Sequence, residues 1–194
     1  MGKKLQPNDG AVFGISNSLG LFEKLKYDST NLRKNWNDYD AFNFFVTSWH
    51  LYHDWTKSDS LRALSRVKRD SNKLPKEIKL VLNVVKELAN GSKHFLLNQS
   101  QKSTEKRKIM EVHEGIEANP YSYFFHEDIP AVSVDEHWYF SIRVLHNIII
   151  SYFDWVFDDS ADATNFPNHI MEAILYCHVP SRKVGRPPEI CCQN

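Results

Sequence analysis

The stretch EHWYFSIRVLHNIIISYFDWVFD, from Glu136 to Asp158, decides the fold. Its apolar residues are spread over nearly all sides of a helix instead of forming one stripe. A helix that is apolar all round must be covered on every side, so such helices lie in the middle of a bundle. We therefore predict a long central helix over residues 136–158.

Helical spacing of apolar residues also predicts the elements around this helix. They are helices over residues 18–36, 40–57, 59–69 and 75–91 before it, and a short helix over 168–177 after it. Asn37 and Asp40 are N-cap candidates, Pro75 suits a first helical turn, and Gly91 is a candidate C-cap. The protein is therefore expected to be mainly helical.

Between residues 109 and 134 the apolar period changes from helical toward two. Residues 109–116 and 131–134 alternate loosely, and turns are expected at Asn119-Pro120 and Ile129-Pro130. The predicted fold class is α+β, mainly α, a helical bundle with a small antiparallel β insertion before the long central helix. With no internal repeat and no strong linker, residues 1–194 are expected to form one domain, with a loose N-terminal segment (1–16) and a C-terminal tail (179–194).

The composition excludes several classes of protein. The chain has 194 residues, with 24 Lys and Arg against 24 Asp and Glu, so its formal charge is zero and gives no global attraction to nucleic acid or anionic membrane. Three cysteines, two of them the adjacent Cys191 and Cys192, make no disulfide framework. The N-terminus lacks the apolar core of a signal peptide, and the run 142–157 is too short and polar for a membrane span. We expect a cytoplasmic protein without a membrane partner.

The second predicted helix carries a polar stripe among many aromatic rings. Its members, at spacings of three and four residues, are Asn43, Thr47, His50, Asp54 and Lys57. His53 lies one position beside the stripe. The pattern fits either a solvent-facing surface or a binding site made of His50, His53 and Asp54.

The spacing of His50 and His53 also suits two metal ligands on one helix face. A third ligand would have to come through the fold, from His94, His113, His146 or Asp154. The zinc-protease pattern, with a glutamate after the first histidine, is absent. We expect no metal and no cofactor, and a metal-dependent hydrolase using His50 and His53 is the last of three hypotheses.

A second polar stripe lies at the end of the fourth predicted helix. It contains Asn83, Glu87, Asn90 and His94. Gly91 and Ser92 are small and allow close approach of a ligand or another backbone, while Lys93 and His94 suit a phosphate or an RNA backbone. Alternatively, Gly91 serves helix packing and His94 caps carbonyls at the helix end. The candidate binding residues here are Asn90, Ser92, Lys93 and His94.

Two segments carry a resemblance to other proteins. Residues 41–51 (AFNFFVTSWHL) with Asp54-Trp55, and residues 88–95 (LANGSKHF), resemble a group of poorly characterised bacterial and phage proteins. The resemblance covers residues 40–158, and its most specific part is the Asn-Gly-Ser-Lys-His run. That group is similar to HEPN-type helical bundles, which include RNases of toxin–antitoxin and phage-defence systems and commonly form homodimers.

The catalytic pattern of HEPN RNases is an arginine followed, after four to six residues, by a histidine on one late helix. Here the late helix has Arg143 and His146, with only two residues between them. Arg107 and His113 have a permitted spacing but lie in the segment predicted as β. The catalytic motif is therefore not carried over, and the candidates for catalysis are Lys93, His94, Arg143 and His146.

Three functions follow, in order. The first is a non-catalytic binding or regulatory bundle with a protein or RNA partner, in a phage or bacterial defence context. The second is a metal-independent RNase of HEPN type, in which a histidine transfers the proton and a cation stabilises the phosphorane. The third is the metal-dependent hydrolase.

The Arg182–Pro187 segment partly resembles an AT-hook but has valine where the first core arginine is needed, so it is interpreted as a basic tail.

Overall fold

The computed structural model describes residues 14–56, 74–91, 109–113, 131–134, 137–162 and 164–178. Over these ranges the protein is α+β and mainly helical, as the sequence predicts. The helices are α1 (Ser18–Asn35), α2 (Asp38–His50) with its π-helical continuation η1 (Leu51–Trp55), α5 (Lys76–Gly91), α7 (Ile142–Phe157) and α8 (Asn168–Leu175). The strands are β1 (Ile109–His113), β2 (Ala131–Val134) and β3 (Trp138–Ser141). The helix predicted over residues 59–69, residues 1–13 and the tail 179–194 lie outside the described ranges.

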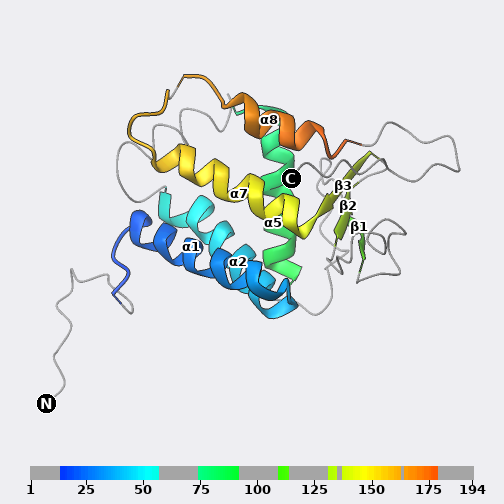
Figure 1. Ribbon diagram of the computed structural model, residues 1–194, viewed down its shortest axis with the longest axis horizontal. Coiled ribbons are helices and arrows are strands. Elements are labelled where there is room, and N and C mark those ends of the chain that lie inside the picture. The colour runs from blue at the N-terminus through cyan, green and yellow to red at the C-terminus, as the bar shows by residue number, and fades with distance from the viewer. Residues whose placement is uncertain are drawn as a thin grey trace, which may run out of the picture.

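The helix α7 is the centre of the bundle. Figure 1 shows it between the α1–α2 pair and α8, with α5 crossing behind it and the sheet at one end. Nine of its residues are buried, among them Leu145, Ile149, Tyr152 and Phe153. The predicted central helix is therefore confirmed in its place and in its apolar character.

The start of the central helix was predicted wrongly. Residues 138–141 form β3, and the helix begins only at Ile142. The side chain of Ser141 accepts a hydrogen bond from the Val144 backbone N–H at 3.2 Å, which caps the helix there. The aromatic residues before Ser141 suit a strand, and Phe140 is fully buried opposite Val132 of β2.

The three strands form one antiparallel sheet in the order β1-β2-β3. The β1–β2 register shifts between Ile109 and Glu111, and β2 pairs with β3 from Ala131↔Ser141 to Val134↔Trp138. On the outer edge of β3, the Tyr139 backbone N–H donates to Cys177 O at 3.0 Å. This contact ties the sheet to the chain just after α8.

Side-chain caps begin the first two helices. Asn17 accepts from Gly20 N and Asn37 accepts from Asp40 N, so the predicted cap of the second helix is confirmed. Ile15, expected in a loose segment, packs against the core. None of the helices in the described ranges has the length and apolarity required to cross a lipid bilayer.

Candidate functional site

Two histidines and one aspartate form a hydrogen-bonded cluster where α2 continues into η1. The carboxylate of Asp54 accepts from His50 Nδ1 at 2.8 Å and from His53 Nδ1 at 2.6 Å. An ionised carboxylate only accepts, so both rings carry a proton on Nδ1. Burial opposes the charge of Asp54, but the hydrogen bonds from His50 and His53 outweigh it and hold the pKa of this carboxyl below its ordinary value. The cluster is exposed and can bind or orient a polar group.

The structure joins His53 to this cluster, whereas the sequence placed it beside the polar stripe. The reason is the π-helical turn, in which the Thr56 backbone N–H donates to Leu51 O, five residues back. The angular spacing of side chains in such a turn differs from that of an α-helix. A wheel drawn at 3.6 residues per turn therefore misplaces His53.

The predicted polar stripe is also not one continuous solvent face. Thr47 is 5% exposed, and its hydroxyl donates to Asp28 Oδ2 at 2.7 Å. The ammonium of Lys24 donates to both of these side chains. Thr47 is therefore part of a buried polar bridge between α1 and α2, whereas Asn43 and Asp54, on either side of it in the stripe, are exposed.

A metal-dependent site gains no support from this geometry. In the ranges that the structure describes, there is no group of three His, Cys, Asp or Glu side chains that could hold a metal ion. Of the proposed third ligands, His146 is buried against α1 and Asp154 lies on a groove beside the C-terminal half of α7. His94 and the side chain of His113 lie outside the description, as do Ser92 and Lys93.

Arg143 and His146 lie where α1, α2 and the first turns of α7 meet, with Arg143 half-buried and His146 buried. His146 is 3% exposed, and its ring packs against Phe44 at 4.9 Å and against Trp36 at 5.5 Å. The guanidinium carbon of Arg143 lies 5.2 Å from the centroid of the Trp36 ring. Trp36 ends α1 with a left-handed backbone (φ 49°), which sets its indole in this corner.

Both ring nitrogens of His146 are engaged. Asn147 Oδ1 accepts from Nδ1 at 3.0 Å, so in the neutral ring Nε2 accepts from the Ser29 hydroxyl at 2.6 Å. Burial lowers the pKa of His146, the Asn147 hydrogen bond opposes this, and the charge of Arg33 lowers it further. Ser29 and His146 have the spacing of a nucleophile and its base, but both are under a tenth exposed. No substrate atom reaches them in this conformation.

The buried thiol of Cys177 is equally unsuited to catalysis. Burial raises its pKa to about 12, so it stays protonated at neutral pH. Only the thiolate is a strong nucleophile.

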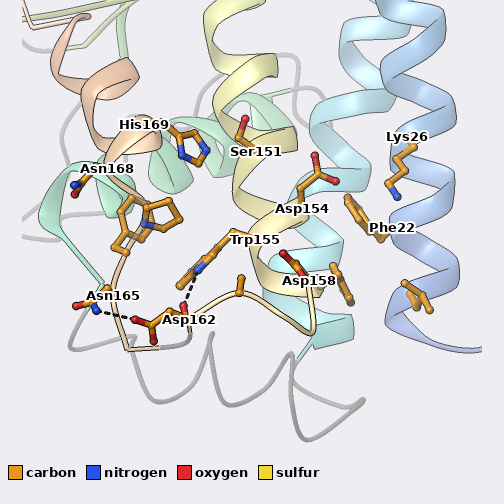
Figure 2. Close-up of a pocket in the computed structure, with 15 residues that line it drawn as sticks. Phe22, Lys26, Ser151, Asp154, Trp155, Asp158, Asp162, Asn165, Asn168 and His169 are labelled. Atoms are coloured by element: carbon orange, nitrogen blue, oxygen red, sulfur yellow. Dashed lines mark hydrogen bonds between the residues drawn. The ribbon is translucent and has the colours of Figure 1, made fainter.

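The opposite end of α7 borders an open groove of about 1050 Å³. Figure 2 shows it between α1, the C-terminal half of α7 and the segment that leads into α8. Its aromatic lining consists of Phe22, Trp155, Phe157 and Phe166, and its charged lining consists of Lys26, Asp154, Asp158 and Asp162. The Trp155 indole N–H donates to Asp162 O at 3.1 Å and holds the loop against the helix.

The three carboxylates of the groove differ in their partners. Asp158 Oδ1 accepts from the backbone and hydroxyl of Ser160, and Asp162 accepts from Thr164 and Asn165. The Thr164 hydrogen bonds, and then those of Asn165, hold the pKa of Asp162 below its ordinary value. Asp154 has no side-chain hydrogen bond or ion pair to any residue that the structure describes, and in Figure 2 its carboxylate points toward the space between α7 and α1.

Sequence reasoning missed this groove. The signal was present, because Ser151, Asp154 and Asp158 recur at spacings of three and four and form one polar line on a helix interpreted as apolar all round. The α1 side of the groove, made of Leu19, Phe22 and Lys26, lies more than a hundred residues away in the sequence and could not be assigned to it.

Asn83 is exposed and Asn90 half-buried on α5, so the described part of the second predicted stripe does reach solvent. Whether this stripe meets the His50 cluster stays a prediction, since residues 92–94 are outside the described ranges.

Comparisons with protein-family models, with curated protein sequences and with solved structures give no match for this chain.

Proposed function

We propose that this protein is a non-catalytic binding protein, which holds a partner polypeptide in the groove beside the C-terminal half of α7. The observation that carries the proposal is the burial of His146. An RNase histidine must meet the ribose hydroxyl or the leaving oxygen, within about 3 Å of the proton it transfers. His146 instead uses both ring nitrogens within the fold.

The groove supports a polypeptide partner over RNA. Among the lining residues that the structure describes, three carboxylates stand against one ammonium, that of Lys26, so this part of the groove is locally negative, and a phosphate backbone is repelled by such a surface. An open, partly aromatic groove of this size accommodates a peptide segment, since clefts of roughly 300–1,000 Å³ hold drug-sized ligands.

The resemblance to HEPN-type bundles adds the rest of the proposal. It supports a cytoplasmic homodimer with a role in bacterial or phage defence. Light scattering of the purified full chain tests the dimer, and a monomer at all accessible concentrations would remove that part.

RNA degradation tests the absence of catalysis. The full chain is incubated with labelled single-stranded and double-stranded RNA in the presence of a chelator, beside His146→Gln and Arg143→Gln. We expect intact RNA in all three samples. Cleavage by the wild type that both substitutions abolish, in variants with unchanged circular dichroism, would establish the RNase instead.

Site-directed capture tests the binding surface. A photoreactive phenylalanine analogue replaces Phe166 at the groove, and a matched variant carries it at Tyr39, which is 84% exposed at the start of α2. We expect irradiation in native cells to give a discrete cross-linked species from position 166 alone. Equal capture from both positions would contradict a binding site at the groove.

A further inference from the structure

The groove wall on α7 combines a carboxylate and an aromatic ring. Asp154 and Phe157 are three residues apart on the helix, so their side chains are neighbours on its surface. Asp154 is exposed and has no side-chain partner in the described ranges, while Phe157 is half-buried and lines the groove. A partner group that is both planar and cationic would satisfy the two together.

A cation of the chain itself already lies on an aromatic ring of the groove, on the α1 side. The Lys26 ammonium is 4.3 Å from the centroid of the Phe22 ring, and Phe22 stacks on Phe157 with the ring centroids 4.8 Å apart and the planes 13° apart. Lys26 also pairs with Glu23 at 3.1 Å. The Phe22–Phe157 pair therefore already has a cation beside it on the α1 side of the groove, and the C-terminal half of α7 contributes no lysine or arginine of its own.

We propose that the groove binds an arginine side chain of a partner polypeptide, with its guanidinium paired to Asp154 and stacked on Phe157. The inference rests on the proposed function and names the chemistry of the partner. The charge of the whole chain is zero, so the excess of carboxylates is a property of this site and not of the protein.

Arginine fits better than lysine for two reasons. A guanidinium presents a planar fork that pairs with both oxygens of a carboxylate, and it stacks on aromatic rings. An ammonium is a strongly hydrated point charge that does neither as well. Asp158 and Asp162, whose oxygens are already hydrogen-bonded in the loop, add long-range attraction more than direct contact.

The test uses the full chain and three fluorescein-labelled peptides. One is Gly-Ser-Arg-Gly-Ser-Arg-Gly-Ser, and its counterparts carry lysine or the neutral isostere citrulline in place of arginine. Affinity is measured by anisotropy at low ionic strength, and the Trp155 indole N–H resonance, identified with Trp155→Phe, reports binding at the groove. Asp154→Asn is compared with Asp159→Asn, which removes the same charge from the same region without lining the groove.

We expect the arginine peptide to bind more tightly than the lysine peptide and far more tightly than the citrulline peptide, and to shift the Trp155 resonance. Asp154→Asn should weaken binding about tenfold, the loss typical of a charge-assisted hydrogen bond, and Asp159→Asn less than about twofold. Equal binding of citrulline, equal effects of the two variants, or no binding at millimolar peptide would each overturn the inference. The RNA degradation assay is independent of the peptide assay, so the two hypotheses can fail separately. If RNA stays intact and the peptides show no preference for arginine, only the proposed arginine ligand is wrong. If RNA is cleaved and the cleavage depends on His146, the proposed binding function is wrong.

Discussion

The two ends of α7 use the same kinds of residue in opposite ways. At the N-terminal end, His146 faces Ser29 of α1 and is sealed by Trp36 and Phe44. At the C-terminal end, Asp154 faces Lys26 of the same neighbouring helix across an open groove. Both ends carry titratable side chains, but α2 covers only the first.

This difference teaches that the surroundings of a titratable side chain, and not its type, separate a structural role from a functional one. A buried polar side chain must be hydrogen-bonded, and His146 is bonded at both nitrogens. An exposed carboxylate such as Asp154 keeps its hydrogen-bonding capacity for a partner. His146, one of the catalytic candidates of the sequence, is therefore structural, and Asp154, which the sequence offered only as a possible third metal ligand, is the candidate for binding.

The largest expected effect is on stability at the closed end. His146→Ala should lower the free energy of unfolding by about 3 kcal/mol, because it leaves a cavity and an unsatisfied Ser29 hydroxyl. Urea denaturation measures the change. The matched control is His169→Ala at the edge of the groove, where the residue is exposed and a loss under about 0.5 kcal/mol is expected. Equal losses of unfolding free energy at both positions would contradict a structural role of His146 that His169 lacks.

The buried and the exposed histidine should also differ in how they affect the pH dependence of stability. The pKa of His146 is lowered in the folded protein by burial, so the unfolded chain, with its histidine pKa near about 6.5, binds a proton first. The stability that His146 contributes is therefore fully present above the pKa of the unfolded chain. It is lost as the pH falls from that pKa toward the lower pKa of the folded protein. Urea titrations at pH 7 and pH 5 should therefore show a smaller acid-induced loss for His146→Gln than for the wild type.

The matched control for this titration is His169→Gln. It removes one histidine from the surface and is expected to keep the acid-induced loss of the wild type. A loss of the same size in His146→Gln as in the wild type would mean that His146 is not the group responsible.

The smallest effect is expected at the open end. Asp154→Ala should change the free energy of unfolding by less than about 0.5 kcal/mol, because no described side chain depends on this carboxylate. Asp28→Ala is the buried comparison, and it should cost roughly 2 kcal/mol because Thr47 and Lys24 lose their shared acceptor. A clear destabilisation by Asp154→Ala would show that the groove is part of the core.

Local signals predicted much of the fold. Apolar spacing located α1, α5 and α8, and the alternation at 109–113 and 131–134 located β1 and β2. It failed at residues 138–141, where a run of aromatic residues suits a strand as well as a buried helix and the cap at Ser141 decides between them. It failed again at η1, because a π turn has no sequence period of its own.

Of the candidate sites, the sequence supplied the pair His50 and Asp54 from their spacing alone, since residues four apart meet on any helix. It could not supply the groove, which joins α1, α7 and the chain before α8 across more than a hundred residues.

What the sequence determined by itself is local and periodic: a mainly helical chain with an apolar central helix, two of the three antiparallel strands, and a set of polar residues without assigned roles. Only the tertiary structure decided which of those residues are enclosed. That decision depends on which helices cover each end of α7, and burial controls hydrogen bonding, pKa and access together. For this reason His146 became part of the core, and Asp154 stayed exposed in the groove.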